Sequence, residues 1–137
     1  LLLRIKELFW SNYYPLEEGD RSSQIVRNFK TELERHYRSL YEGIENKPMQ
    51  VNDYAKKQNL NSAYFNQVIK SKTGRSVSTW ISEKAITYAK SQLKNSTFSI
   101  KEICYQLGFS EPAYFSNFFK KKTGVSPTKY RRLKQKQ

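Results

Sequence analysis

The sequence is poor in the residues that catalysis, metal binding or membrane insertion would need. It has one cysteine, Cys104, and one histidine, His36, among 137 residues. A lone cysteine cannot form a disulfide within the chain, which is typical of a reducing cytoplasm. His36 lies on a helical apolar stripe, where packing explains it better than catalysis. We therefore expect a protein that is not an enzyme and that holds no metal and no cofactor.

Long hydrophobic runs are absent as well. No stretch of 18 apolar residues occurs in the sequence, so we expect no membrane-spanning helix and no membrane partner. The chain also begins without Met and without a signal-peptide cleavage pattern. We therefore expect it to be a piece of a longer cytoplasmic protein.

Acidic residues are scarce in the second part of the chain. Residues 47–137 contain eighteen Lys and Arg against four acids, a net charge of +14, whereas residues 1–46 have a net charge of −1. This break falls beside the stretch GIENKPMQ, so we predict a domain boundary near residue 46. A positive excess this large indicates a polyanionic partner, and we place its binding site in residues 47–137.

Apolar residues recur at helical spacing along almost the whole chain, and no segment alternates convincingly as a strand. Ile25, Phe29, Leu33, Tyr37 and Leu40 predict an amphipathic helix over about 22–43. The sequence therefore predicts an all-α protein. The other helices are expected at about 2–13, 51–58, 62–72, 77–93, 100–107, 111–122 and 127–134.

One stretch of the basic part occurs twice. AYFNQVIKSKTGRS, from Ala63, and AYFSNFFKKKTGVS, from Ala113, share eight of fourteen residues. Each copy follows a short predicted helix that contains a small residue and a turn that tolerates left-handed backbone. A short helix, a tight turn and a second helix form the helix-turn-helix unit. We predict two such units, at about 51–72 and 100–122, joined by a spacer helix at about 77–93.

The second helix of such a unit contacts bases with its N-terminal residues on the face away from the core. Setting the apolar positions aside leaves the candidate base-reading residues Ser62, Ala63, Asn66, Gln67, Glu111, Pro112, Ala113, Ser116 and Asn117. Asn and Gln suit this role because each can form two hydrogen bonds with adenine. The alternative that these are ordinary solvated helix residues stays open.

Basic residues recur in register after both predicted reading helices. We predict that they contact DNA phosphates, which position a protein without carrying sequence information. Some of this charge could instead favour the negative ends of the helix dipoles. The candidate phosphate-binding residues are Lys70, Lys72, Arg75, Lys120, Lys121, Lys122 and Arg131.

These motifs resemble a known family of transcription regulators, the AraC/XylS family. SIKEICYQLGFSEPAYFSNFFKKKTGVSPTKYR, residues 99–131, is similar to the family's C-terminal signature almost position for position, and residues 51–81 are similar but looser. Cys104 stands where the family most often has Ala, which is a conservative change. The resemblance covers about residues 47–132. It implies a DNA-binding domain, which we place at residues 47–137. Its two recognition helices would enter consecutive major-groove segments of double-stranded DNA.

The resemblance also implies a wider organisation. Family members usually carry an N-terminal effector or dimerisation domain, so we expect residues 1–46 to be its helical tail or the connector to it. The implied function is a bacterial-type, sequence-specific transcription regulator, by family habit an activator, with RNA polymerase as a partner. A homodimer could form through residues 1–46 or the missing domain. A non-specific nucleic-acid-binding or architectural protein is the alternative, because charge alone favours any nucleic acid.

Overall fold

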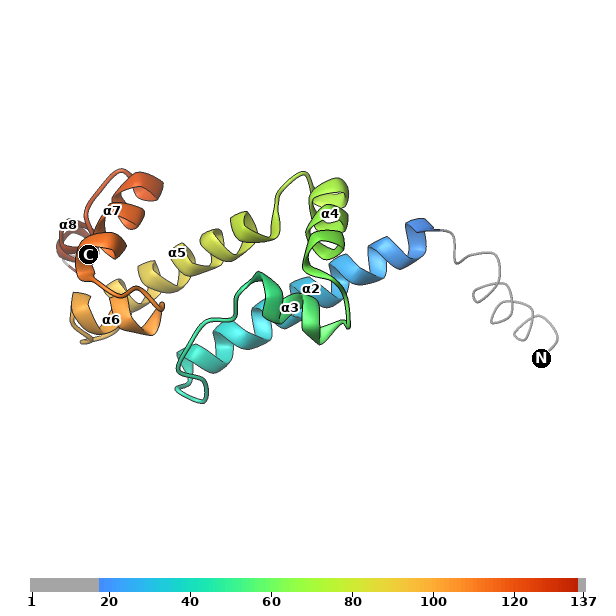
Figure 1. Cartoon of the computed structure of the whole chain (residues 1–137). Helices are drawn as coiled ribbons and strands as arrows, with labels where there is room; N and C mark the ends of the chain where they lie inside the picture. The colour runs from blue at the N-terminus through green and yellow to red at the C-terminus, as the bar shows by residue number, and fades with distance from the viewer. Residues whose placement is uncertain (1–17, 136–137) are drawn as a thin grey trace. The chain divides into compact units, whose positions relative to one another are not determined.

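The computed structural model describes residues 18–135, which form helices and no strand (Figure 1). The all-α prediction is thereby confirmed for the described residues, and the helix predicted over 2–13 lies outside them. No helix in this range is long and apolar enough to cross a membrane. The helices are α2 (Glu18–Tyr41), α3 (Val51–Lys57), α4 (Ser62–Thr73), α5 (Val77–Asn95), α6 (Ile100–Gln106), α7 (Pro112–Thr123) and α8 (Pro127–Gln135).

The helix ends follow from local sequence signals. Gly74 and Gly124 end α4 and α7 in the left-handed conformation, with φ of 80° and 88°, which glycine adopts without steric cost. Ser99 and Glu102 form a complete capping box at the start of α6, because each side chain bonds the other residue's backbone N–H. These ends match the sequence prediction.

Contacts within the chain divide the described residues into two compact units, and each of them contains one helix-turn-helix unit. The first contains residues 18–32 and 51–77, that is, the beginning of α2 with α3 and α4. Its core is aromatic: the ring of Phe29 lies edge-on to Tyr54 at 5.3 Å and to Phe65 at 5.4 Å. The Gln58 side chain also donates a hydrogen bond to the Ile25 carbonyl at 3.0 Å. Helix α2 is therefore part of the core of the first helix-turn-helix unit.

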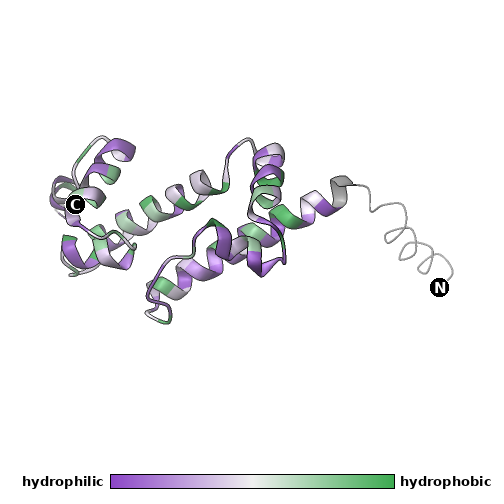
Figure 2. Ribbon diagram, in the orientation of Figure 1, coloured by the Kyte–Doolittle hydropathy of each residue, from purple (hydrophilic) through white to green (hydrophobic). Residues whose placement is uncertain are grey.

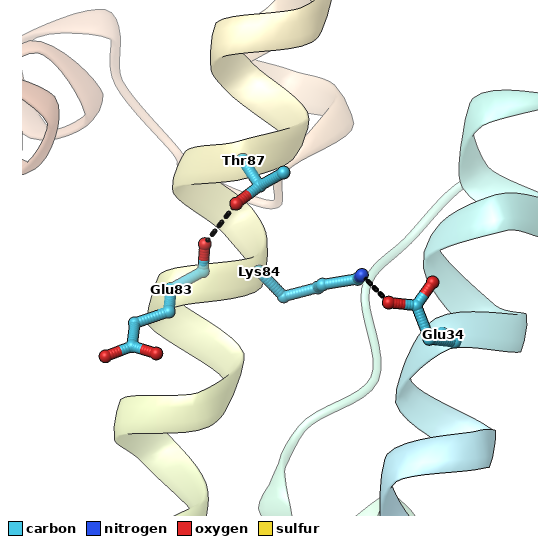
Figure 3. Close-up of polar contacts among 4 residues, drawn as sticks. All are labelled: Glu34, Glu83, Lys84 and Thr87. Carbon is cyan, nitrogen blue, oxygen red and sulfur yellow. Dashed lines mark hydrogen bonds and ion pairs between the residues drawn. The ribbon is translucent and has the colours of Figure 1, made fainter.

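The second unit contains residues 33–50 and 78–135, so the end of α2 packs with α5. Tyr37 and Tyr88 have ring centroids 6.1 Å apart, and burial raises the pKa of Tyr37 to about 12. His36 is buried, with Nε2 2.7 Å from the Lys47 carbonyl oxygen, which agrees with the predicted packing role. At the surface, Glu34 of α2 pairs with Lys84 of α5 (Figure 3).

Helix α5 also has a local polar contact beside this ion pair. The Thr87 hydroxyl donates to the backbone carbonyl of Glu83 one turn earlier, at 3.1 Å (Figure 3). Such a bond to the carbonyl four residues earlier slightly destabilises a helix and often bends it. Helix α5 is nevertheless continuous from Val77 to Asn95.

The apolar stripe of α2 is buried against other helices of the same chain. Hydrophilic and hydrophobic bands alternate along this helix in Figure 2, as expected of an amphipathic helix. Ile25, Phe29, Leu33, Tyr37 and Leu40 are all buried, at 6% exposure or less. The stripe is therefore not free to join two chains, and a homodimer would need another surface. The domain boundary predicted near residue 46 stays a prediction, but α2 supplies buried side chains to both units.

We expect Phe29→Ala to lower the free energy of unfolding by about 3–5 kcal/mol, because it empties a fully buried aromatic site. Urea denaturation followed by circular dichroism measures this. The exposed Thr31→Ala on the same helix should change stability by less than about 0.5 kcal/mol. Equal effects of the two substitutions would show that α2 does not share the core.

Candidate nucleic-acid interface

The two helices of the first unit approach closely because the residue at their contact is small. Ala55 of α3 is fully buried, and Asn59 takes the left-handed backbone, with φ of 57°, that the turn requires. Asn61 then caps α4 by accepting hydrogen bonds from the N–H groups of Ala63 and Tyr64. Phe65 faces the core with no exposed surface, which turns the opposite side of α4 outward.

The second unit repeats this geometry with different residues. Cys104 replaces the small alanine and is fully buried, and burial raises the pKa of its thiol. Gly108 supplies the left-handed turn, with φ of 83°. Phe115 and Phe119 fix α7 on the core. The predictions of a packed Cys104 and of left-handed turn residues are confirmed.

Each unit thus presents one exposed helix face. Ala63, Gln67 and Lys70 of α4 are exposed, and residues spaced by four and seven lie on the same side of a helix. Their equivalents fifty positions later, Ala113, Asn117 and Lys120 of α7, are exposed too. The base-reading candidate Glu111 is exposed just before α7, and its side chain makes no capping hydrogen bond.

The remaining base-reading candidates are half-buried: Ser62, Asn66, Pro112 and Ser116. Two of them make hydrogen bonds inside the first unit. The Ser62 hydroxyl donates to Oδ1 of Asn52 at 2.6 Å, and Oδ1 of Asn66 accepts from the Val77 N–H at 3.0 Å. Pro112 is the first residue of α7, where its missing N–H costs nothing.

Five of the predicted phosphate-binding residues are exposed lysines close to the two reading faces: Lys70, Lys72, Lys120, Lys121 and Lys122. These residues lie in the last turns of α4 and α7. Arg75 is half-buried.

Arg131 has a structural role that the sequence did not indicate. Its guanidinium donates to the carbonyl oxygens of Leu93, Gln92 and Ser96 at 3.0, 3.3 and 3.4 Å. The Gln92 and Leu93 carbonyls lie in the last turn of α5, where most carbonyls have no backbone donor, and Ser96 directly follows this helix. Arg131 therefore caps α5, and we leave it out of the phosphate-binding set proposed below.

Tyr114 is a surface residue that sequence reasoning missed. Tyr114 is not among the base-reading candidates taken from the sequence, yet its side chain is 60% exposed in the first turn of α7. Successive helix positions differ by about 100°, so Tyr114 and Phe115 cannot both face the core centre. This angular spacing is the sequence signal that Tyr114 faces away from the core. Tyr114 lies beside Ala113 at the start of the exposed face.

Among residues 18–135, no group of three or more His, Cys, Asp or Glu side chains could hold a metal ion. The distinctive features of the two units are instead their exposed helix faces and nearby lysines. Two helix-turn-helix units in one chain define the class to which the fold belongs.

Comparison with known proteins agrees with this class. The family model described as a helix-turn-helix domain matches residues 54–133. The Msm operon regulatory protein of Streptococcus mutans is 29% identical over 119 residues, which cover 87% of this chain and 41% of that protein. The chain therefore spans less than half the length of this relative.

Solved structures show the same fold. The C-terminal domain of AraT, a response regulator from Geobacillus stearothermophilus, superposes with a TM-score of 0.67 at 28% identity, covering 80% of this chain and 84% of that one. A Chromobacterium violaceum transcriptional regulator of the AraC-type DNA-binding group gives 0.67 at 18% identity, covering 84% and 96%. The chain belongs to the AraC-type helix-turn-helix family, whose model matches more than half of it.

We expect Arg131→Ala to lower the free energy of unfolding by about 2 kcal/mol, because three backbone carbonyls lose a charged donor. The neighbouring Arg132 is exposed, so Arg132→Ala removes the same charge and should leave stability nearly unchanged. Thermal or urea unfolding without DNA compares the two variants. Equal stability would contradict the capping role of Arg131.

Proposed function

We propose that this chain binds double-stranded DNA sequence-specifically, with α4 and α7 in consecutive major-groove segments, as the DNA-binding part of a transcription regulator. The observation that supports this most is the repeated exposed face. Ala63, Gln67 and Lys70 of α4 have exposed equivalents in α7 at the same spacing. An amide in the middle of each face, from Gln67 or Asn117, can form two hydrogen bonds with adenine.

The chemistry of the two faces separates reading from positioning. Gln67 and Asn117 are the amides that we propose to contact bases, and Ala63 and Ala113 can pack against thymine methyl groups. Glu111 is exposed before α7 and can accept a hydrogen bond from a cytosine amino group. The lysines at the ends of both helices would bind phosphates, as would Arg75.

The regulatory part of the proposal rests on the family. The matching relative is named as an operon regulatory protein, and this chain covers only part of it. We propose that the whole protein is an activator that contacts RNA polymerase beside its DNA site. Because its ligand would be chromosomal DNA, it would act in the bacterial cytoplasm.

Replacing a base-reading amide should weaken specific binding selectively. We expect Gln67→Ala or Asn117→Ala to cost about 1–3 kcal/mol on a duplex selected from a random pool, and almost nothing on random DNA. Fluorescence anisotropy titrations on both duplexes measure the difference. Equal losses on both would mean that these side chains do not read bases.

A phosphate-binding lysine should behave differently. Lys120→Ala should weaken selected and random duplexes about equally, and should flatten the plot of log K against log salt by about one unit. The matched control is Lys57→Ala, an exposed lysine on α3 outside both reading helices. Should Lys120→Ala affect only the selected duplex, the residue would be a base reader instead.

The DNA site of one chain should lack two-fold symmetry, because a single chain supplies two different reading helices. We expect a non-palindromic site of two major-groove segments, roughly 20 base pairs. Footprinting combined with a stoichiometric titration tests this. A strict need for two chains on a short palindrome would contradict the proposal, and weak binding without sequence preference would favour an architectural protein.

A further inference from the structure

The helices that follow α4 and α7 begin at equivalent positions with different residues. Helix α5 starts at Val77 and α8 starts at Pro127, fifty positions later, and a serine precedes each of them. Val77 and Pro127 are both fully buried. The first N–H groups of a helix have no partner within the helix, so a buried one needs an acceptor from elsewhere.

The first unit supplies that acceptor from its reading helix. Oδ1 of Asn66, on α4, accepts the Val77 N–H at 3.0 Å. A backbone N–H can only donate, so the atom that faces it must be the amide oxygen of Asn66 rather than the nitrogen. This bond ties the middle of α4 to the start of α5.

The second unit meets the same constraint by removing the donor. Proline has no N–H, and its fixed φ suits the first position of a helix. Ser116 stands where the first unit has Asn66. The pairs Asn66 with Val77 and Ser116 with Pro127 are thus two solutions to one problem, at matching places in the two units.

We propose that Asn66 is a positioning residue, which ties reading helix α4 to the Val77 N–H within the first unit, and is not itself a base reader. A two-bond contact with adenine needs both the oxygen and the nitrogen of the amide to face the base. The oxygen of Asn66 faces Val77 instead, and the residue is half-buried. Base reading on α4 then falls to Ala63 and Gln67. This assignment rests on the proposed DNA-binding function, whereas the bond itself does not.

The test is a double-mutant cycle on the whole chain without DNA. Asn66→Ala should lower the equilibrium constant for folding about tenfold, because it leaves a buried N–H without its acceptor. The same substitution in a Val77→Pro background should change it by less than about twofold, since the donor is gone. Ser116→Ala, in the unit that already has proline, is the matched control and should also have little effect. The same loss in both backgrounds would overturn the proposal.

Two further variants keep the test decisive if Val77→Pro fails to fold. Asn66→Asp retains an acceptor oxygen, so it should be closer in stability to the unchanged chain than to Asn66→Ala. In the second unit, Pro127→Val should restore the demand for an acceptor, and adding Ser116→Asn should recover the lost stability. An Asn66→Asp chain as unstable as Asn66→Ala would overturn the proposed bond.

A DNA experiment separates positioning from reading. A random duplex pool is offered to the unchanged chain and, separately, to the chain with both Asn66→Ala and Val77→Pro. If this double variant does not fold, Asn66→Asp takes its place. We expect both to select the same base at every position of the site. Lost preference at one adenine would show that Asn66 reads it. If the unchanged chain selects no sequence, the proposed function fails, while the stability cycle still decides the bond.

Discussion

The close approach of two helices in each helix-turn-helix unit is the constraint on which the rest of the structure depends. Ala55 and Cys104 have no exposed surface, so a larger side chain at either position would overpack the core. The left-handed residues Asn59 and Gly108 then reverse the chain within a few positions. Once the core side of α4 and α7 is fixed in this way, the outward side is fixed as well. The position of the exposed amides and lysines is a consequence of packing.

The two units satisfy their backbone groups by different means, and this difference bears on function. Asn61 caps α4 with its side chain, whereas the side chain of Glu111 makes no capping hydrogen bond at α7. The side chain of Asn66 accepts a hydrogen bond from the Val77 N–H. Pro127 has no N–H, so the second unit needs no matching acceptor. The repeated sequence therefore gives both units the same scaffold, while their polar residues have different roles. The two reading helices are similar in shape but not interchangeable in chemistry.

Helix α2 shows that a segment of different charge composition can still contribute to the same hydrophobic cores. Its charge sets residues 1–46 apart from the basic part, yet Phe29 packs on Tyr54 and Phe65, and Tyr37 packs on Tyr88. Charge balance reports on the ligand of a surface, while apolar periodicity reports on the core. The two signals need not end at the same residue.

The sequence by itself determined the helices of the two helix-turn-helix units and most of their ends, because periodicity, glycine stops and capping residues act over a few neighbouring positions. The helix predicted over about 22–43 is Glu18–Tyr41, so its bounds were less well determined. The sequence also determined which faces of α4 and α7 point outward, since Phe65, Phe115 and Phe119 mark the inward side. The tertiary structure decided which polar side chains are already bound within the chain. Arg131 caps α5, Asn66 bonds Val77, and Tyr114 is left outside the core. These roles depend on groups that packing brings together, some of them tens of residues apart, and no local pattern encodes such a meeting.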